Sequence, residues 1–152
     1  MAKKFKFSLQ KLLNYKEQLF EAERNILAEM NALLLSMQSE LAGLYREHKE
    51  KSAAYLEQAV QGMTSLDMMM HKNYLLSVEE DIRNKIRQIE LQQDAIDKQM
   101  DKVKEAKMEI SSMEKLKEKK YKEYMYKDSK AQEQFIEEFV STKRAMSGDS
   151  LQ

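Results

Sequence analysis

The chain has 152 residues, of which 42% are apolar and 34% charged, and it contains three Gly and no Pro, Cys or Trp. Turns use Gly and Pro at positions with special backbone angles, so this composition excludes a loop-rich globular domain and favours long helices. The 26 basic and 26 acidic residues cancel, which excludes steering to nucleic acid or membranes by an overall field, and the lack of Cys excludes disulfides and thiolate chemistry.

The first seven residues are predicted to form a basic tail, in which Phe5 and Phe7 stand between lysines. A secretory signal would add an apolar core of about 7 to 15 residues, and none follows. No segment approaches the roughly 18 apolar residues of a membrane span, so we expect a cytoplasmic protein. The Phe and Lys alternation has two interpretations, a contact with membrane or nucleic acid, or docking onto the protein's own second helix.

A first helix is predicted over residues 8–60, with Ser8 as a candidate N-cap. From residue 26 onward, one narrow face repeats with steps of three and four, which is typical of a coiled-coil helix. Its members are Ile26, Met30, Leu33, Met37, Leu41, Leu44, His48, Lys51 and Tyr55.

The segment 61–65 is predicted to be a turn. Gly62 can adopt the left-handed conformation that ends a helix, and Thr64 with Asp67 has the spacing of a capping box. One helix therefore ends here and another begins.

A second helix is predicted over residues 66–145, followed by a frayed tail at 146–152. Its expected seam has an almost unbroken 3.5-residue repeat. The seam consists of Leu75, Val78, Ile82, Ile86, Ile89, Gln93, Ile96, Met100, Val103, Lys107 and Ile110.

These elements predict an all-α fold, a single antiparallel two-helix coiled-coil hairpin over residues 1–152 with helix two longer than helix one. Each narrow apolar face needs a partner, and a short turn makes the two helices neighbours. With the turn at 61–64, Leu9 should pair near residue 117. About 25 residues of helix two then extend past helix one, unless the basic tail covers them.

No catalytic or metal-binding motif accompanies the two histidines, His48 and His71. His48 falls on the seam, where an interface histidine is the favoured interpretation over a metal ligand. A phosphate-binding glycine loop is also missing. We therefore expect no enzyme activity, no catalytic residues, no metal and no cofactor.

Two segments have two interpretations each, either as an ordinary part of the helix or as a surface that binds a partner. Residues 112–127 hold six lysines, three glutamates and three tyrosines, which is either an ordinary solvated helix surface or a contact surface. Tyr121, Tyr124 and Tyr126 do not fit on one face, so at least one should be exposed. Residues 67–76 are rich in Met, which suits adaptable binding as well as ordinary packing against helix one.

Three segments resemble the flagellar export protein FliJ family: the start KFKFSLQKLLNYKE, the late MEKLKEKKYKEY (113–124) and the terminal AQEQFIEEFV (131–140). Length and two-helix topology also fit over the whole chain. This sequence has Met113 where Leu is usual in the family, Glu137 where Asp is more common, and Val140 where Ala is more common. Helix one offers only Tyr45 and Tyr55 where aromatic residues are usual.

The resemblance implies a cytoplasmic component of the flagellar type III export apparatus, peripheral to the inner membrane at the flagellar base. Its implied partners are a FliI-like hexameric export ATPase, which it binds like the central stalk of rotary ATPases and helps to assemble, an FlhA-like export gate protein, and export chaperones. Nucleic acid is not among the implied partners, and the protein is implied to associate with the membrane only by binding the export apparatus.

The resemblance also implies two sets of binding residues, and Tyr121 and Tyr124 join the first because helix one runs out near them. The candidate ATPase-binding residues are Phe5, Phe7, Tyr121, Tyr124, Phe135, Ile136, Glu137, Glu138, Phe139 and Val140. The candidate gate-binding residues are Leu41, Leu44, Tyr45, His48, Tyr74, Val78 and Ile82.

Two other classes of function remain open at this point. A generic structural or tethering coiled coil would form a parallel or extended oligomer, whereas a hairpin would be a monomer. A protein that binds nucleic acid or anionic lipid through its lysine-rich end would lose binding steeply with salt. The residues from 108 onward hold nine basic and nine acidic side chains, which disfavours this second class.

Overall fold

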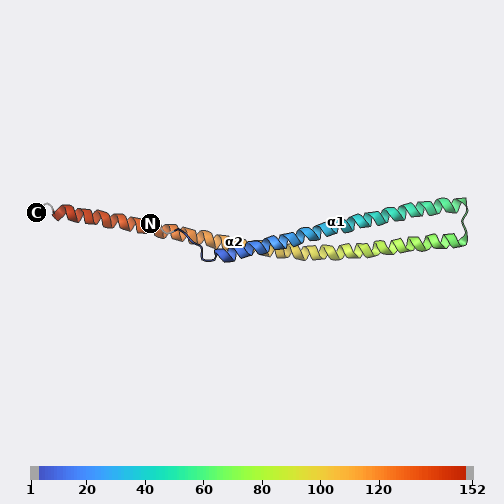
Figure 1. Ribbon diagram of the computed structural model, residues 1–152, viewed down its shortest axis with the longest axis horizontal. Helices are drawn as coiled ribbons and strands as arrows, with labels where there is room; N and C mark the ends of the chain where they lie inside the picture. Colours follow the sequence, from blue (N-terminus) through green and yellow to red (C-terminus); the bar gives the residue numbers. More distant parts are fainter. Residues whose placement is uncertain (1–3, 150–152) are drawn as a thin grey trace. The chain divides into compact units, whose positions relative to one another are not determined.

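The computed structural model describes residues 4–149, which form two helices, α1 (Gln10–Gln61) and α2 (Ser65–Asp149), without a strand (Figure 1). The predicted all-α hairpin with a longer second helix is confirmed. Helix α1 begins two residues after the predicted start. Helix α2 continues to Asp149, into the segment expected to fray. Residues 1–3 of the basic tail and 150–152 of the frayed tail lie outside the described part.

The turn between the helices depends on Gly62 and Thr64. Gly62 has φ 108°, a left-handed conformation that costs glycine nothing because it has no Cβ. The Thr64 hydroxyl then accepts a hydrogen bond from the backbone N–H of Asp67 at 3.2 Å, which caps the start of α2. The Asp67 carboxylate lies in the first turn of α2, where the helix dipole favours negative charge.

The chain divides into two compact units. The hairpin unit, Glu21–Glu105, contains the turn and the two arms that it joins, which lie side by side and antiparallel (Figure 1). The terminal unit combines Met1–Phe20 with Ala106–Gln152, so it pairs the start of α1 with a later part of α2.

The seam of the hairpin unit differs by one residue from the predicted seam at several positions. In α1, Ile26 and Leu33 are 43% and 49% exposed, while their neighbours Leu27 and Leu34 are half-buried. Because both residues of each pair are apolar, the sequence pattern does not distinguish them. Only the contact with the second arm selects Leu27 and Leu34.

In α2, the observed seam differs from the predicted one because polar side chains take part in it. Val78, Ile89 and Ile96 are buried as predicted, but Gln93 and Met100 are exposed, and the residues before them, Gln92 and Gln99, turn inward. Lys107 is likewise exposed and Ala106 half-buried, and Lys85 shares the seam with Ile86. The observed seam of α2 therefore repeats every seven residues, with two inward-facing positions in each repeat. One of these two positions is polar or small, and its successive occupants are Lys85, Gln92, Gln99 and Ala106.

Side-chain amides from α2 bind backbone oxygens of α1 at this seam. Gln92 Nε2 donates to the carbonyl oxygen of Met30 at 3.0 Å, and Gln99 Nε2 donates to that of Glu23 at 3.0 Å. Gln99 also hydrogen-bonds the Glu23 carboxylate and is only 6% exposed. A polar residue at a seam position fixes which residues face each other, because sliding the helices would leave it buried without a partner.

We expect Gln92→Ala to lower the free energy of unfolding by about 1 kcal/mol, the net contribution of one hydrogen bond. Gln93→Ala is the matched control, since Gln93 is adjacent and exposed, and should change it by less than about 0.5 kcal/mol. Urea unfolding followed by circular dichroism measures both values. Equal effects of the two substitutions would show that the seam does not run through Gln92.

The core of the terminal unit is small. Leu13 and Ile110 are each 3% exposed, and Phe7 is 9% exposed. Lys16 Nζ forms an ion pair with Glu109 Oε2 at 2.7 Å between α1 and α2, and Lys107 Nζ lies 5.4 Å from the centre of the Phe20 ring. These contacts hold the first turns of α1 against α2.

Candidate interaction surfaces

An N-terminal strap, residues Lys4–Leu9, precedes α1 and packs against α2 within the terminal unit. The Phe5 ring lies 5.3 Å from the Tyr121 ring at 73°, an edge-on contact, and 5.6 Å from the Tyr124 ring. The only backbone hydrogen bonds that the structure gives this strap are those of Gln10 N to Phe7 O and Leu13 N to Leu9 O. The described part of the basic tail therefore docks onto α2 at Tyr121 and Tyr124, which was one of the two predicted alternatives.

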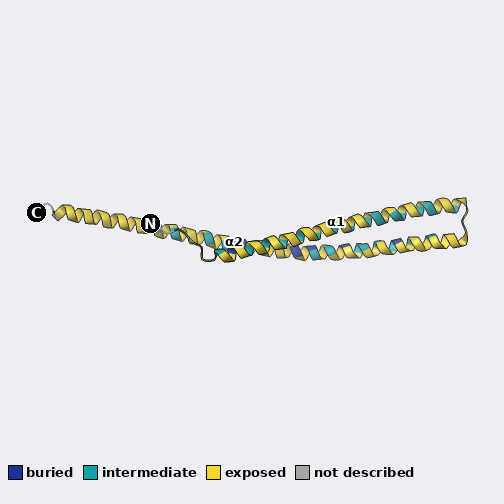
Figure 2. Ribbon diagram, viewed as in Figure 1, coloured by how far each residue is buried: buried dark blue, intermediate teal, exposed yellow. Residues whose placement is uncertain are grey.

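Beyond the strap, α2 has no covering element among the described residues. Every residue from 129 to 148 is exposed (Figure 2). The exposed side chains include four large apolar ones within six residues, with exposed fractions between 40% and 69%. These four residues, Phe135, Ile136, Phe139 and Val140, are called the bare face below.

The bare face has a defined geometry and charge. At about 100° per residue, its four members fall within about 140° of the helix circumference, one side of α2. Glu133, Glu137 and Glu138 lie around it, and the segment 131–142 contains no basic residue. This side of α2 is suited to a partner that offers an apolar contact with basic groups beside it.

The ten candidate ATPase-binding residues therefore fall into two groups. In the first group, Phe5 of the strap packs on Tyr121 and Tyr124 of α2, and Phe7 is buried. Tyr121 keeps 47% of its surface exposed, so the strap covers it only in part. The remaining six residues, 135–140, are exposed with neither Phe5 nor Phe7 on them. The structure thus separates one predicted surface into a covered part and a bare part.

The lysine-rich segment 112–127 is a solvated helix surface in most of its length. Lys122 pairs with Glu118 at 3.2 Å and Lys120 with Glu123 at 3.6 Å, both within α2. Two of the three tyrosines are exposed, as the sequence predicted for at least one of them. Tyr126 is 66% exposed and has Lys130 Nζ 5.8 Å from its ring centre, and Tyr121 is 47% exposed.

The candidate gate-binding residues all lie in the hairpin unit but differ in access. Val78 is buried, with 4% of its surface exposed. Leu41, Leu44, His48 and Ile82 are half-buried, and Tyr45 and Tyr74 are exposed. With the two arms together, Tyr45 and Tyr74 are the members of this set that present most surface to a partner.

Polar contacts join the arms beside these residues. His48 Nε2 lies 3.1 Å from Glu79 Oε1, so the predicted interface histidine has a carboxylate partner on the other arm. The Tyr74 hydroxyl donates a hydrogen bond to the Glu47 carboxylate. That hydrogen bond, with smaller contributions from burial and from the charges of Glu47 and Asp81, raises the pKa of Tyr74 above its usual value of 10.0.

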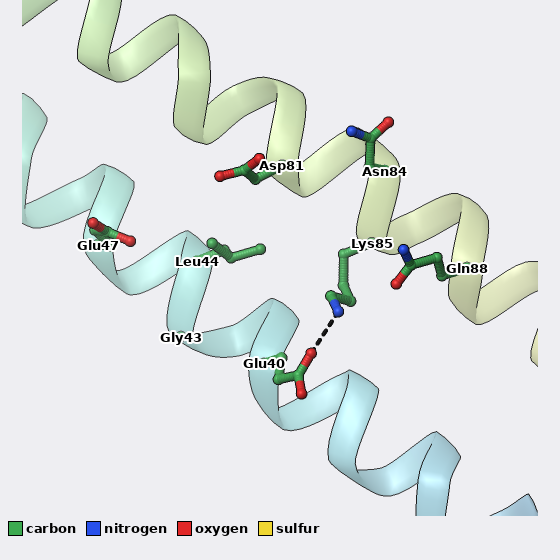
Figure 3. A pocket seen from close by; sticks show the side chains of 8 residues that line it. All are labelled: Glu40, Gly43, Leu44, Glu47, Asp81, Asn84, Lys85 and Gln88. Carbon is green, nitrogen blue, oxygen red and sulfur yellow. Dashed lines mark hydrogen bonds and ion pairs between the residues drawn. The ribbon is translucent and has the colours of Figure 1, made fainter.

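An open groove of about 540 Å³ lies between the arms next to this site (Figure 3). Three carboxylates line it, from Glu40, Glu47 and Asp81, and Lys85 forms an ion pair with Glu40. Gly43 leaves one wall without a side chain. Sequence reasoning missed this groove, because it is formed by residues of two helices that are far apart in the chain.

Within residues 4–149, no group of three or more His, Asp or Glu side chains is placed to hold a metal ion. None of the helices in the same range has a stretch long and apolar enough to span a membrane.

Comparison with known proteins gives one match. A family model described as "Flagellar FliJ protein" matches residues 5–145, nearly the whole chain. No curated protein and no solved structure matches.

Proposed function

Because the chain belongs to the FliJ family of flagellar proteins and so has a role associated with flagellar export, we propose that it binds the hexameric export ATPase. It acts there as a non-catalytic, central-stalk-like subunit that promotes assembly of the ring and couples it to the export gate. In this proposal the protein is cytoplasmic and lies at the inner membrane through the apparatus alone.

The observation that carries this proposal is the bare face of α2. Phe135, Ile136 and Phe139 are each at least 60% exposed. Large apolar side chains that cluster on a protein surface usually mark an interaction site. Aromatic residues are also enriched among those that dominate binding energy. The bare face is therefore the surface that we assign to the ATPase, together with Glu137 and Glu138.

A single helix in the centre of a ring has a direct mechanical consequence. The bare face is on one side of α2, so the subunits of a surrounding hexamer would meet different surfaces of the same helix. Differential contacts shift each subunit toward the state that it binds best. The protein would thereby bias ring assembly and nucleotide turnover without any catalytic group of its own.

The gate-facing surface is assigned to the hairpin unit. Tyr45 and Tyr74 are the exposed aromatic residues of the candidate set, and they lie beside Leu41, Leu44, His48 and Ile82 in the seam. Val78 is buried, so it would hold the two arms together beneath this surface without contacting the gate itself. Export chaperones are a further class of partner in this proposal.

Mixing the purified chain with the export ATPase of the same bacterium tests the proposal. We expect faster ATP hydrolysis and a larger fraction of hexamer, both rising with the amount of chain added and saturating. Hydrolysis is followed by phosphate release and assembly by light scattering after size-exclusion chromatography. If neither changes at saturating chain, the assignment to the ATPase is wrong.

A further inference from the structure

We propose that the N-terminal strap is a displaceable cover on the ATPase-binding side of α2, and that it opens to admit the ATPase. This inference rests on the proposed function, because it concerns the regulation of the same surface. In the closed state described here, Phe5 and Phe7 occupy part of that surface. In the open state the surface extends toward the turn by four to five helical turns.

The covered and bare parts belong to one side of the helix. Tyr121 and Phe139 are 18 residues apart, five turns of an α-helix, so their side chains leave α2 in nearly the same direction. Tyr124 and Phe135 are 11 residues apart, about three turns. The strap therefore lies on the continuation of the bare face, and Phe5 takes the place on Tyr121 and Tyr124 that a partner's apolar side chain would take.

Two rings hold the strap closed. Phe5 contacts both tyrosine rings, and Phe7 is buried. The strap is not part of a helix or strand in residues 4–9, so no ladder of backbone hydrogen bonds adds to this hold. A cover attached by two apolar side chains is easily exchanged for a partner that offers more of them.

The cavity beside Lys6 carries an excess of positive charge. Lys6 lines the same cavity as Lys120 and Lys127, with Glu123 as the one acidic member of that lining. Glu123 pairs with Lys120 on its own helix. Within residues 4–149, no ion pair links Lys4 or Lys6 to an acidic residue. Three of the four charged side chains of this lining are basic, and the repulsion between them in the closed state is screened by salt.

This arrangement predicts a salt dependence that does not require the ATPase. The chain contains no Trp, so Phe5→Trp places a single fluorescent reporter between Tyr121 and Tyr124. We expect its emission to shift to shorter wavelength from low to high salt, because screening favours the closed, less solvated state. An emission maximum that does not move, or moves the other way, would overturn the charge argument.

The coupling to binding is tested by locking and releasing the strap. Lys6→Cys with Glu123→Cys gives the only two cysteines of the chain, at positions that line one cavity. A short bis-maleimide crosslinker with an internal disulfide joins the two thiols and is cleaved by a reductant. We expect the linked protein to bind the export ATPase about tenfold more weakly than the same protein after cleavage, since a locked cover removes the competent state. Phe5→Ser should bind several-fold more tightly than the natural chain.

The controls separate the two proposals. The double-cysteine protein without crosslinker corrects for the loss of the Lys120–Glu123 pair, and circular dichroism confirms that each variant is helical. Equal affinity of linked and cleaved protein, or weaker binding of Phe5→Ser, would overturn the displaceable cover. If no variant binds the ATPase, the proposed function fails, and the tryptophan measurement then decides whether the strap opens at all.

Discussion

Replacing Phe135 and Phe139 together with Ser should remove most of the affinity for the export ATPase and leave the protein folded. Both side chains are largely exposed, at 69% and 60%, so their loss costs the free protein no packing. A fully buried Phe contributes about 1.5–3 kcal/mol relative to an exposed one. If both rings are buried at the interface, the loss is about 3–6 kcal/mol, roughly 100-fold to 10,000-fold in Kd.

Binding of the variant and the natural chain to the ATPase is compared by calorimetry or by titrated stimulation of hydrolysis. Leu35→Ser is the matched control, because Leu35 is 68% exposed and belongs to the hairpin unit, whereas the bare face belongs to the terminal unit. It should leave both readouts within about twofold of the natural chain. A double variant that binds as well as the Leu35→Ser control would exclude the bare face as the ATPase contact.

The fold class was predictable because it depends on features that act locally. Too few Gly and no Pro leave room for a single turn, and the sites of Gly62 and Thr64 were recognisable from the sequence. The structure then shows the left-handed φ of Gly62 and the Thr64 cap. Long helices with a narrow apolar face have one inexpensive way to bury that face, which is to fold back on each other.

The seam was predicted less well because its polar members depend on the second arm. A periodicity argument favours Met100 over Gln99, since Met is apolar. The structure buries Gln99 because the carbonyl oxygen and carboxylate of Glu23 satisfy its amide. Those partners are 76 residues away in sequence, and no local pattern contains them. The same reason hid the groove between Glu40 and Asp81 from sequence reasoning.

The exposure of the candidate ATPase-binding residues was predictable only in part. Its bare members follow from the lengths of the two helices, because the longer one must extend beyond its partner. Whether the strap covers Tyr121 and Tyr124 depends on the path of a non-helical segment, which helix periodicity does not describe. The two ring contacts of Phe5 in the structure decide that point.

Leu13→Ala should destabilise the protein by about 2–5 kcal/mol, the range for truncating a buried Leu. Leu13 is 3% exposed, and the buried apolar residues of the described chain number six in all. Each therefore carries a large share of the core. In the terminal unit, Leu13 lines one groove with Phe5, Gln10 and Tyr121, so the cavity left by the substitution should also loosen the strap.

The measurement is urea unfolding at equilibrium, followed by circular dichroism, with Leu12→Ala as the matched control. Leu12 is the preceding residue of α1 but is 42% exposed, and Ala has the higher helix propensity, so its substitution should cost less than about 1 kcal/mol. The Phe5→Trp reporter in the Leu13→Ala background should show the longer-wavelength emission of an open strap. Equal destabilisation by both substitutions would mean that Leu13 is not the buried contact between α1 and α2, and that the strap is held by Phe5 and Phe7 without support from α1.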